Sequence, residues 1–235
     1  MERWRISEDE DLEKENLKKP ESLNRRYIEQ LFEGTDRIAE TMLASVNIAY
    51  LAGITEDAHL GQGGKEGYVF DIESKSERWL TDIVMPALKL ELSEEKEVKV
   101  TRRGTRPEYR IQVWDKDLVE TLRVLFERPG IVRLWSIRKQ RAWVRGLADA
   151  EGSATRNTDK QPQFSFYNKD FEKLKIAGEI LEKDGVHFGF YLPQGRDVWQ
   201  MYLTGRENLK RFLDGEASGV SHPEKRSRLL QYLAE

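Results

Sequence analysis

The sequence has no cysteine and only three histidines in its 235 residues. The absence of cysteine excludes disulfides, thiolate metal sites, iron–sulfur clusters and a cysteine nucleophile. Three histidines leave little room for a zinc site or a histidine-based catalytic triad. No run of about 18 apolar residues exists to span a membrane, and the N-terminus has no apolar signal segment. We therefore expect no membrane partner, a cytoplasmic (prokaryotic or archaeal) or organellar location, and chemistry based on carboxylates and a hard divalent metal.

An excess of basic residues, which most nucleic-acid-binding proteins carry, is also absent. The chain has 39 basic and 42 acidic residues, which gives a formal net charge of −3. Residues 1–46 hold 12 acidic and 8 basic side chains, so the remainder holds 30 acidic and 31 basic. The acidity is therefore concentrated in a charged N-terminal segment, and the overall charge does not exclude a DNA-binding body.

The spacing of apolar residues predicts the same series of elements twice, with an offset of 93 residues. Each series is αββαββα, which predicts an α+β fold of two subdomains related by a pseudo-twofold axis. The expected division is a helical N-terminal extension over 1–46, a first repeat over 47–128, a linker over 129–140 and a second repeat with a C-terminal helix over 141–235. The expected elements are helices at 47–61, 77–92, 117–127, 138–152, 171–185, 206–215 and 222–235, strands at 67–76, 153–160 and 163–170, and hairpins at 96–116 and 186–205.

Each repeat opens with a similar nonapeptide, LAGITEDAH at 51–59 and VRGLADAEG at 144–152. Small residues lie four apart around Gly53 in the first and around Gly146 in the second, a spacing that lets two helix backbones approach closely. Acidic residues end both helices, where the helix dipole is negative and disfavours a carboxylate. A divalent cation bound between paired carboxylates would compensate for that charge.

Both nonapeptides resemble the LAGLIDADG motif of homing endonucleases, and the order of elements resembles that family over about residues 47–215. The resemblance implies two repeats packed through the motif helices, with a curved antiparallel sheet saddle that binds a long double-stranded DNA site. It further implies a single-chain monomer, associated with an intron or intein. Such a monomer uses Mg²⁺ or another divalent cation, and metal-activated water, to cut both strands.

The same resemblance assigns the metal-binding acid to the eighth motif position. This position is Glu151 in the second copy, but Ala58 in the first. Asp57 could substitute for the missing acid through a distortion of the helix end, or the site could be asymmetric, or Ala58 could be an inactivating change. The family also implies polar and basic residues around the site, for which the aligned positions are Ser74, Asn168, Lys116 and Arg206.

Alternation along the strands predicts a free sheet face in each repeat that could read base edges or hold phosphates. The candidates are Lys99, Thr101, Arg103, Arg110, Gln112 and Trp114 in the first repeat, and Ser153, Thr155, Asn157, Gln163, Ser165, Tyr167 and Lys169 in the second, with Arg102, Arg106, Arg156 and Lys160 in connecting turns. The basic stretch 133–141 either contacts phosphates or forms a charged linker.

These observations favour a site-specific double-stranded DNA endonuclease, impaired or asymmetric at the first motif. The alternative is a non-cleaving nucleic-acid binder of the same fold, either an intron RNA maturase or a DNA-binding regulator. Ala58 and the weak positive charge somewhat favour this alternative. A protein–protein module that uses the acidic N-terminal helices is a third possibility without specific support.

Overall fold

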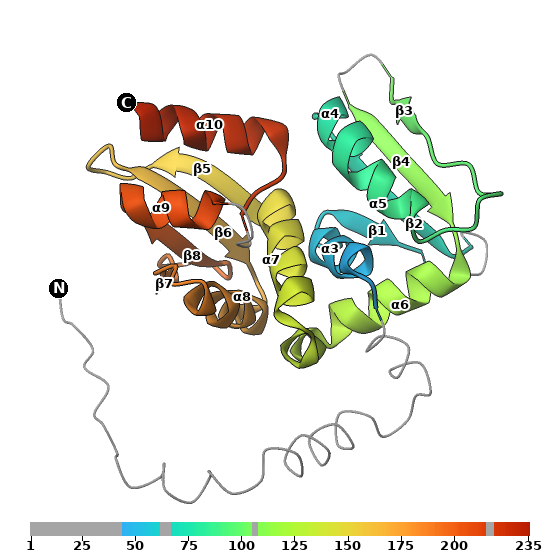
Figure 1. Ribbon diagram of the computed structural model, residues 1–235, viewed down its shortest axis with the longest axis horizontal. Coiled ribbons are helices and arrows are strands. Elements are labelled where there is room, and N and C mark those ends of the chain that lie inside the picture. Colours follow the sequence, from blue (N-terminus) through green and yellow to red (C-terminus); the bar gives the residue numbers. More distant parts are fainter. Residues whose placement is uncertain (1–43, 62–66, 105–107, 215–218) are drawn as a thin grey trace, which may run out of the picture. The chain divides into compact units, whose positions relative to one another are not determined.

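The computed structural model describes residues 44–61, 67–104, 108–214 and 219–235 (Figure 1). The N-terminal extension up to residue 43, the glycine-rich turn at 62–66 and Arg106 lie outside these ranges. Two four-stranded antiparallel sheets are present among the described residues. Helices α3 and α7 pack against each other between them.

The first repeat begins with α3 (Val46–Ile54), whose N-cap Ser45 accepts a hydrogen bond from the Ile48 amide. Its sheet has the order β1-β2-β4-β3. The elements that follow α3 are β1 (Ala58–Leu60), β2 (Val69–Ser74), α4 (Glu77–Trp79), the π-helical turn η1 (Leu80–Val84), α5 (Met85–Lys89), β3 (Val100–Arg102), β4 (Tyr109–Trp114) and α6 (Lys116–Glu127).

The second repeat follows the 3₁₀ helix η2 (Pro129–Leu134) and repeats the sheet order as β5-β6-β8-β7. Its elements are α7 (Ile137–Glu151), β5 (Gly152–Arg156), β6 (Pro162–Asn168), α8 (Phe171–Lys183), β7 (Gly189–Tyr191), β8 (Trp199–Thr204), α9 (Arg206–Leu213) and the additional helix α10 (Pro223–Ala234). The predicted α+β fold of two αββαββα repeats is therefore confirmed.

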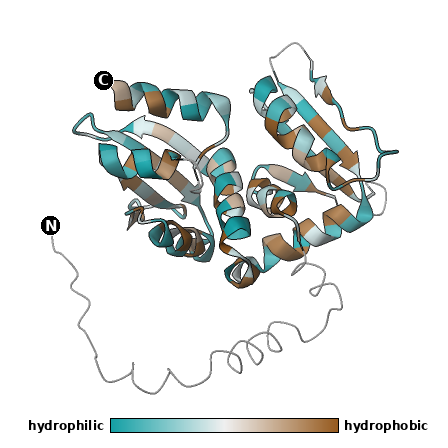
Figure 2. Ribbon diagram, viewed as in Figure 1, coloured by the Kyte–Doolittle hydropathy of each residue, from teal (hydrophilic) through white to brown (hydrophobic). Residues whose placement is uncertain are grey.

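Each sheet buries one face beneath its helices, and apolar and polar residues alternate along those helices (Figure 2). Phe70, Ile72 and Ile111 are fully buried in the first repeat. In the second repeat Phe164 and Phe166 pack against Phe212 of α9, with ring centroids 5.0 and 6.1 Å away. These cores hold the sheets rigidly beside the motif helices.

Two predicted helices differ from those observed. The helix predicted over 47–61 ends at Ile54, and residues 58–60 form β1 instead, because this segment pairs with β2. The helix predicted over 77–92 ends at Lys89, and it passes through Pro86. The turn before Pro86 is π-helical, with the Met85 amide bonded to the Leu80 carbonyl. This wider turn accommodates a residue that lacks a backbone donor.

Candidate active site and nucleic-acid interface

The motif helices α3 and α7 touch backbone to backbone at Gly53 and Gly146. A Cβ atom added to Gly53 would lie 2.2 Å from the Trp143 carbonyl oxygen, and one added to Gly146 would lie 2.2 Å from that of Tyr50. Only glycine permits this approach, because any side chain would collide with rigid backbone. The predicted packing of the repeats through these two helices is confirmed, and it brings their C-terminal ends together.

The two motif helices end differently. Helix α7 runs to Glu151 and leads directly into β5. Helix α3 stops at Ile54, and the Asp57 and Ala58 amides bond to the Ile54 and Thr55 carbonyls, three residues back. Such bonds belong to the tighter 3₁₀ geometry, which uses fewer residues for each turn than an α-helix. The first motif therefore reaches its strand with one residue fewer than the second.

Sheet register shows which residues of the two motifs occupy equivalent places. Ser74 and Asn168 are equivalent, because each accepts a bond from the amide two residues on, at the N-cap of the following helix. Ile72 lies two residues before Ser74 and pairs with Ala58, and Phe166 lies two residues before Asn168 and pairs with Gly152. Asp57 consequently precedes its strand as Glu151 does. Alignment of the two helices makes Ala58 the equivalent of Glu151. Alignment of the two sheets makes Asp57 the equivalent of Glu151 instead.

The carboxyl groups of Asp57 and Glu151 share a crowded negative region. Desolvation, followed by the charges of Asp57 and Glu56, raises the pKa of Glu151 from 4.5 to about 7. The pKa of Asp57 is also raised, because nearby protein atoms desolvate its carboxyl group even though the residue is exposed. The charge of Lys225 opposes this rise, and repulsion from Glu56 adds to it. Neighbouring carboxylates repel each other and raise each other's pKa in this way unless a cation lies between them.

The donor set of this region suits part of a coordination shell for a hard divalent cation. Carboxylate oxygens are the ligands that Mg²⁺ and Ca²⁺ prefer, and Mg²⁺ in particular usually keeps waters and substrate phosphates as further ligands. Among the described residues, no three His, Asp or Glu side chains are grouped to hold a metal by themselves. Asp57 and Glu151 therefore suit a cation that takes its remaining ligands from outside the protein.

Glu56 joins the end of the first motif to the second repeat. Its carboxylate forms a buried ion pair with Lys173 of α8 at 2.5 Å and accepts a 2.9 Å hydrogen bond from Asn168. The Lys173 ammonium also lies 3.6 Å from the centre of the Phe126 ring. These contacts place Asn168 beside Glu151, in a shared cavity of about 610 Å³.

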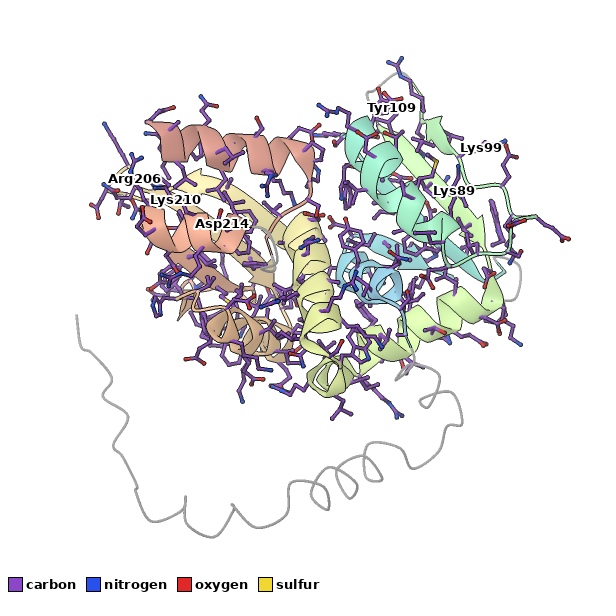
Figure 3. All side chains as sticks on the ribbon, in the orientation of Figure 1. Lys89, Lys99, Tyr109, Arg206, Lys210 and Asp214 are labelled. Carbon is purple, nitrogen blue, oxygen red and sulfur yellow. The ribbon has the colours of Figure 1, made fainter. Side chains whose placement is uncertain are left out.

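The structure places the other three residues predicted around the site away from it or in other roles. Ser74 caps the start of α4 through the Ser76 amide. Lys116 lies 5.5 Å from the Tyr68 ring centre, and Arg206 donates to the Leu233 carbonyl of α10. Strands β4 and β8 run away from the carboxylates, so the residues that follow them lie at the opposite sheet ends. Figure 3 shows Arg206 at the outer end of α9, remote from α7.

Asp149 and Lys225 lie beside the site, although neither was among the predicted site residues. The Asp149 carboxylate accepts bonds from the Tyr50 hydroxyl at 2.7 Å and from the Ser221 and His222 amides at 2.7 and 2.8 Å. Burial raises the pKa of Asp149, and these donors oppose the rise. Lys225 of α10 reaches the end of α7. No sequence signal indicated Lys225, because α10 lies outside the repeated pattern.

The open face of the first sheet carries acids opposite its predicted DNA-binding residues. Arg110 donates to Asp71 through Nε at 2.7 Å and through Nη2, and Gln112 donates to the same carboxylate at 3.1 Å. Arg103 pairs with Glu73. Desolvation opposes the effect, but the bond and charge of Arg110 hold the pKa of Asp71 below its usual value. This face is therefore an ordered network of charges.

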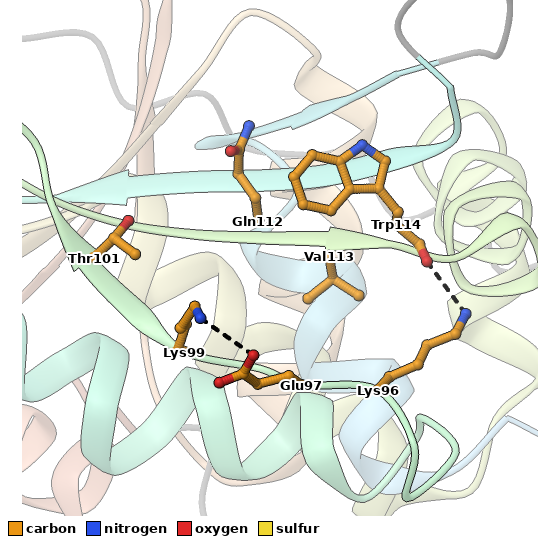
Figure 4. Close-up of a pocket in the computed structure, with 7 residues that line it drawn as sticks. All are labelled: Lys96, Glu97, Lys99, Thr101, Gln112, Val113 and Trp114. Atoms are coloured by element: carbon orange, nitrogen blue, oxygen red, sulfur yellow. Dashed lines mark hydrogen bonds and ion pairs between the residues drawn. The ribbon is translucent and has the colours of Figure 1, made fainter.

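The outer end of this face forms a shallow pocket around Trp114, which is 59% exposed. Lys96 donates to the Trp114 carbonyl at 3.2 Å, and Lys99 pairs with Glu97 at 3.1 Å (Figure 4). Thr101 lies beside this pocket and donates to the Arg110 carbonyl at 3.3 Å. The exposed Arg102 alternates with Thr101 along β3 and so points to the other side.

The open face of the second sheet is uncharged along its strands. Register aligns Ser153 with Ser165 and Tyr202, and Thr155 with Gln163 and Thr204. Tyr167 aligns with Gln200 in the same way. Alternation along β8 would have identified the three β8 residues, Gln200, Tyr202 and Thr204, which were not among the predicted contacts.

Several predicted contacts in the turns have partners within the protein. Arg156 faces α10, where it lies 4.8 Å from the Tyr232 ring centre and pairs with Glu235, rather than on the open face. Asn157 accepts the Asp159 and Gln161 amides in the turn that holds Lys160 at a φ of 59°. Lys169 pairs with Asp197 at 2.7 Å.

Two arginines of the basic stretch 133–141 are paired with acids of the second repeat. Arg133 binds Glu179 and Glu172 at 2.7 and 2.6 Å, and Arg141 binds Asp184 at 2.5 Å. These pairs fix η2 and the start of α7 against α8. They support a structural role for this linker over the alternative of phosphate contacts.

The fold and site define a class of two-repeat α+β proteins in which paired carboxylates lie at the ends of two closely packed helices, beneath two sheets. Residues 138–215 match the model of the LAGLIDADG-like domain. Homing endonuclease I-ApeI of Aeropyrum pernix is 28% identical over 199 residues, which cover 78% of this chain and 86% of that protein. Homing endonuclease I-DmoI of Desulfurococcus mucosus is 26% identical, covering 63% of this chain and 74% of that protein.

Structural similarity agrees with these sequence matches. The crystal structure of I-DmoI in complex with DNA and Mn matches with a TM-score of 0.55 at 25% identity, covering 72% of this chain and 94% of that one. Residues 138–215 thus match a LAGLIDADG-like domain, and most of the chain is similar to two homing endonucleases, as its motifs indicated. Among the described residues, no helix has the length and apolar character required to cross a membrane.

Proposed function

We propose that this protein is a site-specific endonuclease that binds a long double-stranded DNA site as a monomer and hydrolyses a phosphodiester bond in each strand. The observation that carries the proposal is the equivalent placement of Asp57 and Glu151 at the ends of the two packed motif helices. Two homing endonucleases with related sequences support it, as do structures of I-DmoI with DNA and Mn or Ca.

Asp57 and Glu151 would hold Mg²⁺ or a similar divalent cation together with the scissile phosphate. When bound, such a cation supplies Lewis-acid stabilisation of the phosphate charge and favours ionisation of water. Because desolvation and the neighbouring acids raise the pKa of Glu151 to about 7, Glu151 is partly protonated at neutral pH, and cation binding there should release protons. Asn168 and the Glu56–Lys173 pair position the end of the first motif beside Glu151.

The neutral face of the second sheet and the charged face of the first would contact the two halves of the DNA site. Amide and hydroxyl groups can bond to base edges in the major groove. Arg110, oriented by Asp71, keeps guanidinium donors for a guanine edge or a phosphate. We propose these open faces, rather than Arg156 or Arg206, as the DNA contacts.

The test is cleavage of a supercoiled plasmid that contains the uninterrupted duplex into which the host intron or intein is inserted. With Mg²⁺, wild type should give linear product, whereas Asp57→Asn and Glu151→Gln should each lose at least about tenfold in rate, as expected when a metal ligand is removed. Glu127→Gln is the matched control, because Glu127 lines the same cavity but lies at the end of α6, outside both motifs. Unchanged cleavage by Asp57→Asn would exclude Asp57 from the site.

The same assay tests the alternative function. Tight duplex binding without any nicked or linear product, in both Mg²⁺ and Mn²⁺, would contradict the endonuclease proposal. That result would favour a DNA-binding regulator, whereas binding of intron RNA in preference to the duplex would favour a maturase.

A further inference from the structure

Helix α10 lies outside the duplicated pattern, yet it contributes a side chain to the end of α7. The Lys225 ammonium donates to the Asp149 and Ala150 carbonyls at 2.5 and 2.7 Å. These carbonyls belong to the last turn of α7, where backbone acceptors lack partners within the helix. A cation in this position also opposes the negative end of the helix dipole.

Lys225 also acts through its charge on three acids of this region. Its charge opposes the rise in pKa of Asp57, Asp149 and Glu151. Burial lowers the pKa of Lys225 itself, and the same three acids oppose that fall. Lys173, the other buried lysine nearby, also opposes the rise in the pKa of Glu151, but its ammonium is bound to Glu56.

The chain just before Lys225 is fixed to both repeats. His222 stacks on Trp79 of the first repeat with ring centroids 5.0 Å apart, and the Glu224 carboxylate accepts the Ser76 hydroxyl at 2.6 Å. The Ser221 and His222 amides bind Asp149 of the second repeat. These contacts hold the first turn of α10 in place, so Lys225 projects from a rigid base.

We propose that Lys225 is the resident counter-ion of the candidate site, a positioning residue whose ammonium offsets Asp57 and Glu151 while no divalent cation is bound. The inference rests on the proposed function and extends it to the metal-free protein. A single positive charge beside two carboxylates leaves a net negative site, so a divalent cation is still attracted. Without Lys225, the carboxylates would repel more strongly and a divalent cation would relieve more repulsion.

The test compares thermal unfolding of wild type, Lys225→Gln and Lys225→Arg in EDTA and in saturating Mg²⁺. Lys225→Gln keeps a hydrogen-bond donor but removes the charge, whereas Lys225→Arg keeps the charge. In EDTA, Lys225→Gln should lower Tm by on the order of 3 °C or more, and Mg²⁺ should raise its Tm by more than it raises that of wild type. Arg228→Gln, at an exposed basic residue of the same helix, is the matched control and should behave like wild type.

A double-mutant cycle in EDTA separates the counter-ion role from simple capping. If the charge matters, Lys225→Gln should lower Tm less in the Glu151→Gln background than in wild type. Equal losses in both backgrounds, together with an equal effect of Mg²⁺ on both proteins, would overturn the proposal. If Lys225→Gln does not fold, Glu151→Gln should restore folding, and failure to do so would overturn it as well.

The cycle requires neither metal nor cleavage, so it remains informative if the endonuclease proposal fails. A wild-type protein that neither cuts DNA nor is stabilised by Mg²⁺ would contradict the proposed function alone. Charge coupling between Lys225 and Glu151 in EDTA would then still establish the counter-ion.

Discussion

Replacing Glu151 with glutamine should stabilise the metal-free protein at alkaline pH. The carboxylate is held beside Asp57 and Glu56 in partly desolvated surroundings, which raises its pKa from 4.5 to about 7. Glutamine has nearly the same shape but never ionises. The substitution therefore removes a repulsion that the folded state suffers and the unfolded chain does not.

The sign and size of this effect follow from linkage. Because the folded pKa is raised, the protonated carboxyl favours the folded state below pH 4.5, and this contribution is lost as the pH rises through about 7. At about 1.36 kcal/mol for each pKa unit, the rise corresponds to roughly 3 kcal/mol. Glu151 retains some contact with solvent, which screens its charge, so we expect about 1–2 kcal/mol at pH 8.

Urea unfolding of wild type and Glu151→Gln in EDTA, at pH 4.5 and pH 8, measures the effect. Comparison at each pH cancels the titration of groups elsewhere in the protein. The free energy of unfolding should be about equal for the two proteins at pH 4.5 and higher for the variant at pH 8. Equal stability at both values, or lower stability of the variant at pH 8, would refute the reasoning that these carboxylates repel.

Further substitutions test the framework of the site. Gly53→Ala should destabilise by at least about 2 kcal/mol in thermal unfolding, because its Cβ would collide with the Trp143 carbonyl. Gly130→Ala meets nothing within 4 Å and should have little effect. Lys173→Met should cost about 3–5 kcal/mol in urea unfolding, since Glu56 would stay buried without its partner, and Glu56→Gln should recover part of this. Asp149→Ala should reduce amide-exchange protection across α10, and unchanged protection would contradict its anchoring role.

The repeat and its helix-packing interface were predictable because both depend on patterns within short stretches of the sequence. Helical spacing, strand alternation and a glycine in each motif each depend on a few neighbouring residues. Gly53 and Gly146 permit the close approach directly, because the absence of a Cβ atom is itself the structural property. Tertiary contacts did not have to be known for that prediction.

The position of the first carboxylate was not predictable by the same route. Alignment of the motifs counts residues along the chain and so assigns Ala58 to the place of Glu151. The structure ends α3 with two 3₁₀-type bonds, which advance the chain faster and leave Asp57 before the strand. Whether a helix ends in α or 3₁₀ geometry is decided by pairing of β1 with β2, and this pairing is a tertiary interaction.

Partners of charged side chains were also beyond the sequence. Strand alternation correctly placed Arg110 and Gln112 on the open face, but it did not show that Asp71 pairs with Gln112 across the sheet. Lys225 lies 74 residues after Glu151 in a helix without a repeat counterpart. Cross-strand register and the path of α10 determine these contacts, and neither is set by local spacing.

The two repeats share a backbone plan but differ in charge, and this difference bears on how a nearly neutral chain could bind DNA. The first sheet neutralises its arginines with Asp71 and Glu73, whereas the second sheet has amides and hydroxyls along its strands. Phosphate attraction from the open faces is consequently modest, and recognition has to depend more on base edges than on counterion release. A binding site of this kind favours discrimination over non-specific affinity, and discrimination is what the proposed site-specific cleavage requires.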